Sequence, residues 1–495
     1  MRTNSDLGAP SDLAPVGLPT AATALYSVGA TRDIEHACMV GLTPHVLMQR
    51  AGLAVARLTL ALAPHARTIW LACGPGNNGG DGLEAAMHLK QWGKNPVVTW
   101  LGTPGKVSPD TATSHQRAIE AGVSFTDQPP AIFDFCIDAL LGIGASGGRA
   151  PEGQMAQWIG ILNRGDAPVL AADLPTGLSA ETGHAAPLSV RAQFTLSLLT
   201  LKPGLYTAHG RDACGQIWLD SLGVAAKTKT FEPTAWLAGM PAMPTRLHAS
   251  HKGTYGDVAI VGGAPGMTGA ALLAASAALN FGAGRVFVGL LDGGLMRVAP
   301  QQPELMFRAV DGLNLKSVSV VCGCGGGDLV RHHLPRLLSS QAPMVIDADA
   351  INSIANDSQL KTLLRSRGVR GLQTVLTPHP LEAARLSGKS AADVQHDRLS
   401  ACQQMAERFG CTVVLKGSGT VVAAPGQIPV INPTGNAALA TAGTGDVLAG
   451  MVGARLAAGL LAFQAAIDAV YHHGARADKR SAYSALTASE LVSLL

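Results

Sequence analysis

The sequence predicts an α/β protein made of two doubly wound domains, each with a mainly parallel sheet covered by helices. Three observations support this fold class. A buried strand, a glycine-rich loop and a helix follow one another near residue 75 and again near residue 262. Short apolar runs alternate with helical patterns after both points, as in consecutive βαβ units. The 495 residues also exceed the size of one ordinary core, so at least two domains are expected.

The composition argues against several classes of function. Charged residues make up 14%, the net charge is +3, and Lys and Arg are scattered, so no basic stripe indicates nucleic acid. The eight cysteines show neither a Cys-x-x-Cys pair nor a zinc-type spacing with His, which favours buried, reduced thiols. No signal peptide is recognisable, and the apolar run 270–291 is interrupted by Asn280 and Arg285. We expect a cytoplasmic protein without a membrane segment.

The first domain is expected to start with helices, because apolar residues recur at spacings of three and four between Thr31 and Gly52. Strand 68–72 follows and ends in the loop Cys73-Gly-Pro-Gly-Asn-Asn-Gly-Gly-Asp-Gly82, after which a helix is expected. Glycines let the backbone approach a ligand closely, and a helix N-terminus attracts anions. A glycine loop alone is weak evidence. The hexapeptide Asn-Asn-Gly-Gly-Asp-Gly is far more specific, because it adds amide and carboxylate groups.

Polar residues also follow two later strands of this domain. Strand 132–137 is expected to end at Asp138, and strand 168–172 at Asp173. Because the carboxyl ends of parallel strands share one edge of the sheet, these residues and Asn78 should converge there. Each Asp alone is more often a cap or turn residue. Polar residues at three corresponding strand ends are better explained by a shared site.

These motifs resemble the YjeF N-terminal family of NAD(P)H-hydrate epimerases over roughly residues 18–222. The matching segments, in order and spacing, are Tyr26-Ser-Val, Asn77-Asn-Gly-Gly-Asp-Gly82, Asp138-Ala-Leu-Leu-Gly-Ile-Gly and Asp173-Leu-Pro-Thr-Gly177. The resemblance implies a Rossmann-like domain in which Asp173 is catalytic. It implies potassium held by Asn78, Asp138 and Thr176; many relatives have Ser in place of Thr176, and either hydroxyl can ligate a hard cation. The implied substrate-binding residues are Asn77, Asn78, Gly79, Gly80, Asp81, Gly142, Ile143, Gly144, Ala145, Ser146, Gly147, Gly148 and Asp173.

A junction is expected within residues 223–248, where periodicity weakens and Pro, Thr and Lys collect. We place the second domain at 232–495. Its expected strands are 257–261, 285–290, 318–321, 344–346, 374–376 and 412–415, with helices between most of them.

The most informative stretch of the second domain is Asn432–Asp446, which runs into an apolar helix. Its Gly443-Thr-Gly-Asp446 turn places free backbone N–H groups and the positive end of the helix dipole together, which makes an anion site. An Asp on that first turn can take a proton from a hydroxyl while the N–H groups hold the phosphoryl group that the hydroxyl attacks. The alternative, an Asp that only caps the helix, stays open for the isolated motif.

Together these features resemble the ribokinase-like fold, specifically the ADP/ATP-dependent NAD(P)H-hydrate dehydratases, over roughly 232–495. The matching segments are Gly253-Thr-Tyr-Gly-Asp-Val258, Thr377-Pro-His-Pro-Leu-Glu382, Lys416-Gly-Ser-Gly-Thr420 and Gly435-Asn-Ala with Gly443-Thr-Gly-Asp446. One stretch departs from the family's usual Gly-Pro-Gly-Leu-Gly and reads Gly323-Cys-Gly-Gly-Gly327. The resemblance implies hydrate binding by Ala270, Gly325, His379 and Asp446, with Asp446 catalytic. It implies adenine-nucleotide binding by Lys416, Gly417, Ser418, Gly419, Thr420 and Gly445.

Two neighbouring domains that each resemble half of one repair pathway favour a bifunctional enzyme, an isomerase joined to a lyase. Its substrates would be the hydrates NADHX and NADPHX. The first domain would epimerise their R and S forms with K⁺, and the second would dehydrate the S form with Mg²⁺ and ADP, giving AMP and phosphate. The alternative is a ribokinase-like vitamin kinase fused to a non-catalytic Rossmann-like ligand-binding module. The sequence leaves open ADP versus ATP as donor and the oligomeric state, a homo-oligomer included.

Overall fold

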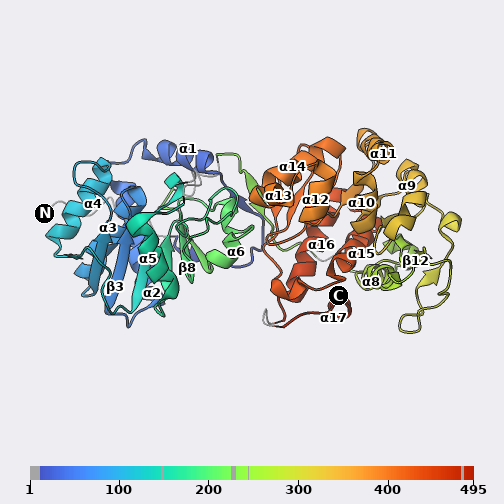
Figure 1. The fold of residues 1–495 in the computed structure, drawn as a ribbon, viewed down its shortest axis with the longest axis horizontal. Helices are drawn as coiled ribbons and strands as arrows, with labels where there is room; N and C mark the ends of the chain where they lie inside the picture. The colour runs from blue at the N-terminus through green and yellow to red at the C-terminus, as the bar shows by residue number, and fades with distance from the viewer. Residues whose placement is uncertain (1–11, 146–149, 225–229, 243–244, 481–483) are drawn as a thin grey trace. The chain divides into compact units, whose positions relative to one another are not determined.

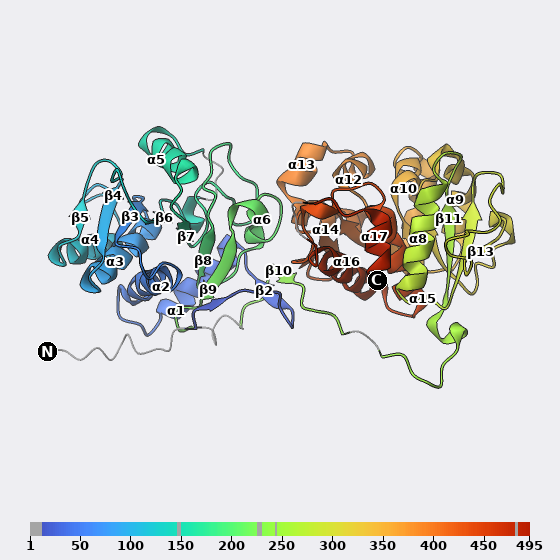
Figure 2. The ribbon, with the colours of Figure 1, turned by 90° about the horizontal axis from the view of Figure 1, so that it is seen from below.

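The computed structural model describes residues 12–145, 150–224, 230–242, 245–480 and 484–495. The chain divides into two compact units (Figures 1 and 2). The first comprises Ala24–Ala235 and the described residues up to Pro19, and the second comprises Thr20–Thr23 and Trp236–Leu495. The short strand β2 (Thr23–Leu25) starts in the segment grouped with the second unit.

The first unit is built on an eight-stranded sheet with the order β1-β9-β8-β7-β6-β3-β4-β5. All neighbours are parallel except β1 and β9. Since β3 is the first of the parallel strands along the chain and its neighbours β4 and β6 lie on either side, the direction of winding reverses between β3 and β6. The strands are β1 (Ala14–Pro15), β3 (Thr68–Cys73), β4 (Asn95–Trp100), β5 (Ser124–Phe125), β6 (Phe135–Ala139), β7 (Val169–Ala172), β8 (Phe194–Leu198) and β9 (Gln216–Asp220).

Both faces of this sheet are covered, which explains the apolar runs of its strands. Ile69 and Leu71 of β3 belong to a core shared with α1, α2 and α3, whereas Trp70 and Ala72 pack with α5 on the other face. The helices are α1 (Val28–Met39), α2 (Val46–Leu62), α3 (Asn77–Gln91), α4 (Pro109–Glu120), α5 (Gly153–Arg164) and α6 (Gly210–Ala213). The prediction of a doubly wound parallel sheet is confirmed for this unit.

Strand β6 starts three residues later than the sequence predicted and includes Asp138, which was expected just beyond its end. The reason lies before the strand, where Ile132 is 82% exposed and therefore does not join the sheet. Asp134 then accepts hydrogen bonds from the backbone N–H groups of Arg67 and Thr68, which fixes the start of pairing with β3.

The second unit is built on a sheet with the order β13-β12-β11-β14-β15-β16-β17-β18-β19-β10. The neighbours from β13 to β17 are parallel, and β18 is antiparallel to both β17 and β19. Here the winding reverses between β11 and β14. The strands are β10 (Ala235–Leu237), β11 (Asp257–Gly262), β12 (Arg285–Leu290), β13 (Met306–Phe307), β14 (Ser319–Cys322), β15 (Met344–Ile346), β16 (Thr374–Leu376), β17 (Thr412–Leu415), β18 (Val421–Ala423) and β19 (Val430–Ile431).

Two helices of this unit, α8 and α15, pack closely against each other. A Cβ on Gly450 of α15 would lie 2.1 Å from the carbonyl oxygen of Ala274 on α8, so the two helices cross with their backbones nearly in contact (Figure 2). The helices are α8 (Thr268–Asn280), α9 (Val330–Ser339), α10 (Ala348–Ala355), α11 (Ser358–Val369), α12 (Pro380–Ser387), α13 (Ala391–His396), α14 (Arg398–Phe409), α15 (Thr444–Ala457), α16 (Ala462–Ala477) and α17 (Ala488–Ser493).

Two further predictions from the sequence concern the cysteines and membrane-spanning helices. All eight cysteines are buried, as predicted. Within the described ranges, no helix is both long enough and apolar enough to span a bilayer.

We propose domain boundaries of 18–222 and 232–495 and expect fragments 1–225 and 230–495 to fold separately, because each holds its own sheet and core. Each fragment should unfold cooperatively when its circular dichroism is followed on heating. Two insoluble fragments would contradict the proposed boundaries.

Candidate active sites

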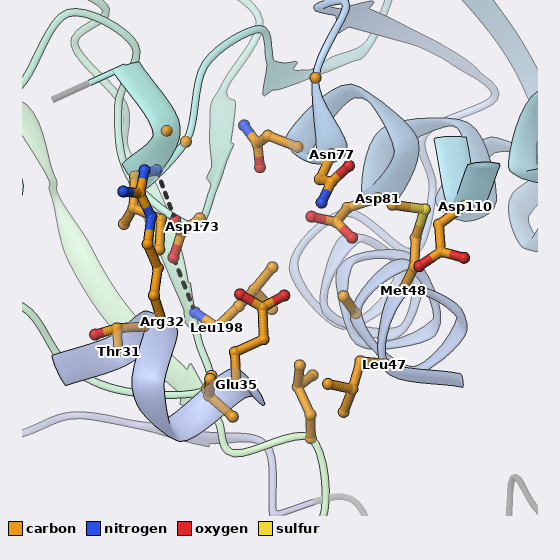
Figure 3. A pocket seen from close by; sticks show the side chains of 18 of the residues that line it. Thr31, Arg32, Glu35, Leu47, Met48, Asn77, Asp81, Asp110, Asp173 and Leu198 are labelled. Carbon is orange, nitrogen blue, oxygen red and sulfur yellow. Dashed lines mark hydrogen bonds between the residues drawn. The ribbon is translucent and has the colours of Figure 1, made fainter. Parts of the chain in front are cut away.

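A cavity of about 760 Å³ lies in the first unit (Figure 3). Its wall includes residues of α1, α2 and the start of α3, together with the segments that follow β6, β7 and β8. These segments meet at the carboxyl end of the sheet, where the winding reverses. This is the position at which open α/β sheets bind ligands.

Glycines allow the segments after β3 and β6 to touch. A Cβ on Gly74 would lie 1.8 Å from the carbonyl oxygen of Leu140, and one on Gly79 would lie 2.0 Å from that of Gly74. The sequence analysis placed Asn77–Gly82 in a loop before the helix, and this is wrong, because α3 already begins at Asn77. Gly82 instead lets α3 lie close to the sheet, since a Cβ there would be 2.7 Å from that of Ala139.

Asp138 and Thr176 form a buried, hydrogen-bonded pair beside the cavity. Thr176 donates its hydroxyl to Asp138 Oδ1 at 2.7 Å and its backbone N–H to Oδ2 at 2.8 Å, and both residues are fully buried. Burial raises the pKa of Asp138 to about 6, although the hydrogen bonds from Thr176 and Leu140 oppose the rise. Asn78 is 8% exposed, and among the described residues neither its Oδ1 nor its Nδ2 has a hydrogen-bond partner. A buried amide without a partner in the protein suits a position that contacts a ligand or an ion.

Asp173 follows β7 in a left-handed conformation, with φ of 69°, which is rare for a residue with a side chain. Its Oδ1 accepts a hydrogen bond from Lys202 Nζ at 2.5 Å, and its Oδ2 accepts one from the N–H of Ile143 at 3.3 Å. Lys202 is fully buried and also donates to Ser197 Oγ and to the carbonyl oxygen of Leu198. All three ammonium protons are thus accounted for, and the charge of Asp173 is balanced.

Asp173, Asp81 and Glu35 present their carboxyl groups to the same cavity from three different elements (Figure 3). Burial raises the pKa of Asp81 well above its usual range, and the charges of Asp173, Glu35 and Glu84 raise it further. Burial also raises the pKa of Glu35, whereas neighbouring His36, Lys202 and Arg32 lower it.

Most predicted residues of the first site lie in or beside this cavity. A Cβ on Gly142 would be 3.2 Å from both Asp173 Oδ2 and Asn78 Cβ, so Gly142 lies between these two residues. Ile143 and Gly144 line the wall, and with Ala145 they form a 3₁₀ turn. Ser146, Gly147 and Gly148 fall outside the described residues. Asn77, Asn78, Asp81, Gly142, Ile143, Gly144 and Asp173 are in the cavity wall, and Gly79 and Gly80 shape the start of α3. Asp138 and Thr176 do not line the cavity but accept hydrogen bonds from Leu140 and Leu141 of its wall.

In the second unit, Gly443 takes φ of 90° as the N-cap of α15, and Asp446 lies in the first turn of that helix. Reactive atoms of Asp446, Asp347 and Cys324 all lie within 4.8 Å of one another. Burial, with the charge of Asp347 adding to it, raises the pKa of Asp446 to about 7. Asp446 therefore changes charge near neutral pH, as suits a general base.

Lys416 belongs to the predicted nucleotide-binding segment 416–420 and contacts Asp347 of this cluster. Its Nζ donates to Asp347 Oδ1 at 2.8 Å, and the hydroxyl of Thr377 donates to the same oxygen at 2.7 Å. A Cβ on Gly445 would lie 3.3 Å from Lys416 Nζ, so the ammonium faces the start of α15. Gly417, with φ of 135°, turns the chain after β17, and Thr420 donates its hydroxyl to the Gly417 carbonyl oxygen at 3.1 Å.

The other predicted residues of the second unit surround this cluster. Gly325 and Ala270 are neighbours, because a Cβ on Gly325 would lie 2.9 Å from that of Ala270. His379 begins α12, and its Nδ1 accepts a hydrogen bond from the N–H of Leu381 at 3.1 Å while its side chain is 46% exposed. The backbone N–H of Lys416 donates to the carbonyl oxygen of Pro378 at 2.9 Å, which brings the segments of His379 and Lys416 together. Ser418 and Gly419 continue the turn after β17.

Sequence reasoning missed Lys202 and Glu35 of the first site. Lys202 follows β8, so the strand-end argument that selected Asp138 and Asp173 would also have found it had it been carried one strand further. Glu35 comes from α1, ahead of the sheet, and no strand-end argument reaches it. Asp347 directly follows β15, and its contacts with Lys416 and Thr377 were not predicted from the sequence.

Two family models match this chain, one in each unit. The family model described as NAD(P)H-hydrate dehydratase matches residues 258–494, and the one described as YjeF-related protein N-terminus matches residues 44–204. The bifunctional NAD(P)H-hydrate repair enzyme of Escherichia coli is 35% identical over 489 residues, which cover 94% of this chain and 90% of that protein. The ADP-dependent (S)-NAD(P)H-hydrate dehydratase of Neisseria meningitidis is 44% identical over 240 residues, which cover 47% of this chain and 80% of that protein.

A solved structure also resembles the chain. It is the ADP/ATP-dependent NAD(P)H-hydrate dehydratase from Bacillus subtilis, co-crystallised with ATP/Mg²⁺, with 32% identity, a TM-score of 0.45, and coverage of 51% of this chain and 91% of that one. The family assignment comes instead from the relatives that align along nearly the whole sequence, such as the Escherichia coli enzyme. The chain belongs to the family of bifunctional NAD(P)H-hydrate repair enzymes.

Proposed function

We propose that the first unit interconverts the R and S hydrates of NADH and NADPH, and that the second dehydrates the S hydrate with ADP, giving AMP and phosphate. The observation that carries this proposal is the pairing of two sites in one chain of this family. One site is a polar cavity around Asp173, and the other is a half-buried base, Asp446, at the amino end of a helix. A ribokinase-like vitamin kinase with a non-catalytic first unit is not favoured, because full-length relatives are repair enzymes.

The epimerase chemistry follows from the substrate. The hydroxyl-bearing carbon C6 is bonded to the ring nitrogen, so the nitrogen lone pair can expel the oxygen and give a cation that water attacks from the other face. Asp173 is suited to handle a proton in this reaction, since it faces the cavity and two neighbouring groups, Lys202 and the N–H of Ile143, fix its position.

Potassium is the cation that we propose beside this site. The amide oxygen of Asn78, a carboxylate oxygen of Asp138 and the hydroxyl of Thr176 are hard oxygen ligands that carry one formal charge together. The unsatisfied amide of Asn78 fits a cation that has its oxygen as a ligand. When bound, potassium would supply positive charge near the entry of the phosphate-bearing substrate.

Replacing Asp138 by Ala should weaken potassium binding and slow R-to-S conversion, because the charged ligand is lost. Dehydration of pure S hydrate should continue at its usual rate. Potassium binding can be measured as the K⁺-dependent rise in melting temperature, and epimerisation by chromatography of the two hydrates. Ser124→Ala, on a distant strand end, serves as a control. Unchanged epimerisation that also ignores replacement of K⁺ by a bulky organic cation would place the site elsewhere.

In the second unit, Asp446 would take the proton from the C6 hydroxyl while the N–H groups at Gly443–Gly445 hold the transferring phosphoryl group. Phosphate is a far better leaving group than hydroxide, and its elimination restores the reduced nicotinamide ring. Lys416, next to Gly445, can balance the charge of the nucleotide phosphates. The cluster of a thiol and two carboxylates, one of them paired with Lys416, does not form a magnesium cage. We propose that Mg²⁺ arrives with the nucleotide phosphates, where it neutralises their charge.

The rate of dehydration should depend on pH through Asp446. Because the base must be ionised and its pKa is raised to about 7, kcat/KM should fall tenfold per pH unit below pH 7 and level off above it. A rate profile between pH 5 and about 9, with the S hydrate and ADP, tests this. A flat profile down to pH 5 would remove Asp446 as the titrating base.

The overall proposal is tested by incubating the purified chain with a mixture of R and S hydrates. Without nucleotide, only interconversion of the epimers is expected. With ADP, both hydrates should be consumed, with one AMP and one phosphate formed for each reduced nucleotide regained. A phosphorylated product that persists would instead favour the kinase alternative. A parallel incubation with ATP determines the donor.

A further inference from the structure

Epimerisation needs proton transfer on both faces of the nicotinamide ring, and Asp173 can serve only one of them. A single carboxyl group can remove a hydroxyl from its own face and return one to that face, which leaves the configuration unchanged. Inversion requires a second group across the ring. Another residue of the cavity must therefore supply this second group.

Asp81 has the required position. It lies on α3, whereas Asp173 follows β7, and the two side chains extend into the cavity from different walls (Figure 3). The two carboxyl groups are close enough for the charge of Asp173 to affect the pKa of Asp81.

The two carboxyl groups also differ in their surroundings. Asp173 is paired with the buried ammonium of Lys202. Around Asp81, burial and the carboxylates of Asp173, Glu35 and Glu84 all favour the protonated form. Glu84 has its own cation, Arg117, at 2.7 Å. One carboxyl group paired with an ammonium and a second one buried among other carboxylates have the different environments expected of an acid and a base that work together.

We propose that Asp81 and Asp173 are the two catalytic carboxyl groups of the epimerase and act on opposite faces of the ring. This inference rests on the proposed epimerase function. Asp81 gives its proton to the departing hydroxyl, the C6–O bond breaks, and the nitrogen lone pair forms a double bond to C6. A water molecule attacks C6 from the other face, the electron pair returns to nitrogen, and Asp173 takes the proton of the water.

The step is balanced and reversible. One water leaves and one water enters, and a proton passes in effect from Asp81 to Asp173. Asp81 is then ionised and Asp173 protonated, which is the state that the reverse reaction needs. Exchange with solvent resets the pair in the absence of the reverse reaction.

Glu35 is the other carboxyl group in the cavity. It lies on α1, and burial and the charge of Asp173 raise its pKa, whereas neighbouring His36, Lys202 and Arg32 lower it. No such opposing effect acts on Asp81, where every contribution raises the pKa. Asp81 is therefore the better proton donor of the two.

The test uses the full chain with each purified hydrate in H₂¹⁸O, without nucleotide, so that dehydration does not proceed. Chromatography measures inversion, and mass spectrometry measures the uptake of label; the rates without enzyme are subtracted. Asp81→Asn and Asp173→Asn should each slow inversion by about 10²- to 10⁴-fold. Each variant should still exchange the hydroxyl of one epimer with retention, and the exchanging epimer should differ between the two variants.

A matched change, Asp33→Asn on the exposed side of α1, should leave both rates as they are. Inversion by Asp81→Asn within threefold of the unmodified chain would overturn the inference. So would loss of both exchange and inversion in a variant with an unchanged melting temperature, because Asp81 would then serve binding alone. If Asp81→Asn does not fold, Asp81→Ser carries the same test. An unmodified chain that neither inverts nor exchanges contradicts the proposed function itself.

Discussion

Replacing Asp446 by Asn is expected to slow nucleotide-dependent dehydration of the S hydrate by about 10²- to 10⁴-fold, the usual scale for the loss of a general base. The amide has nearly the same size and shape as the carboxyl group but cannot accept the proton of the substrate. Epimerisation should be unaffected, since its site lies in the other unit. Single-turnover formation of AMP and of reduced nucleotide measures the effect. Turnover at the usual rate would exclude Asp446 from the mechanism.

The same variant should not be less stable at pH 8. The pKa of Asp446 is raised from its usual 3.8 to about 7 in the folded chain, so the folded state binds this proton more tightly than the unfolded state does. Stability is therefore lost as the pH rises from about 4 to 7, and above that the ionised side chain is a cost that Asn avoids. A melting temperature equal to or above that of the unmodified chain is expected. Asp311→Asn, whose side chain is 86% exposed, serves as the control.

The residues at the ends of parallel strands are the part of these sites that could be predicted from the sequence. Parallel strands end at one edge, so Asp138 and Asp173 could be assigned to one region from the sequence alone. The same argument could not foresee that Asp138 lies within β6, because that depends on where pairing begins, at Asp134. It also could not predict that Thr176 donates two hydrogen bonds to Asp138.

How the charged residues of these sites pair could not be predicted from the sequence. The end of β8 points to Lys202 as a candidate, but a lysine is rarely buried completely, so its burial was not to be expected. Its burial follows from Asp173, whose left-handed backbone turns the carboxylate toward it. In the same way, Asp347, Thr377 and Lys416 come from three strand ends, and only the folded sheet brings them into one hydrogen-bonded cluster.

The second large effect is expected for Lys202→Met, which removes one partner of a buried ion pair. Among the residues that the structure describes, Asp173 then keeps weak backbone partners alone, the N–H groups of Ile143 at 3.3 Å and Leu198 at 3.4 Å. Breaking a buried pair in this way costs about 3–5 kcal/mol. Five of the six tryptophans lie in the first unit, so denaturant unfolding followed by tryptophan fluorescence reports mainly on that unit. Epimerisation should be lost as well. The exposed Lys106, replaced by Met, should change stability by less than about 0.5 kcal/mol.

The double variant Lys202→Met with Asp173→Asn shows whether the lower stability comes from the unpaired charge or from lost packing of the lysine side chain. Removing both charges leaves no unpaired ion, so part of the lost unfolding free energy should return. Asn also suits the φ of 69° at this position, since it tolerates the left-handed region better than most residues do. Epimerisation should remain absent, because the carboxylate that handles the proton is gone. Stability that does not recover would show that packing of the lysine side chain, and not its charge, supports this wall of the cavity.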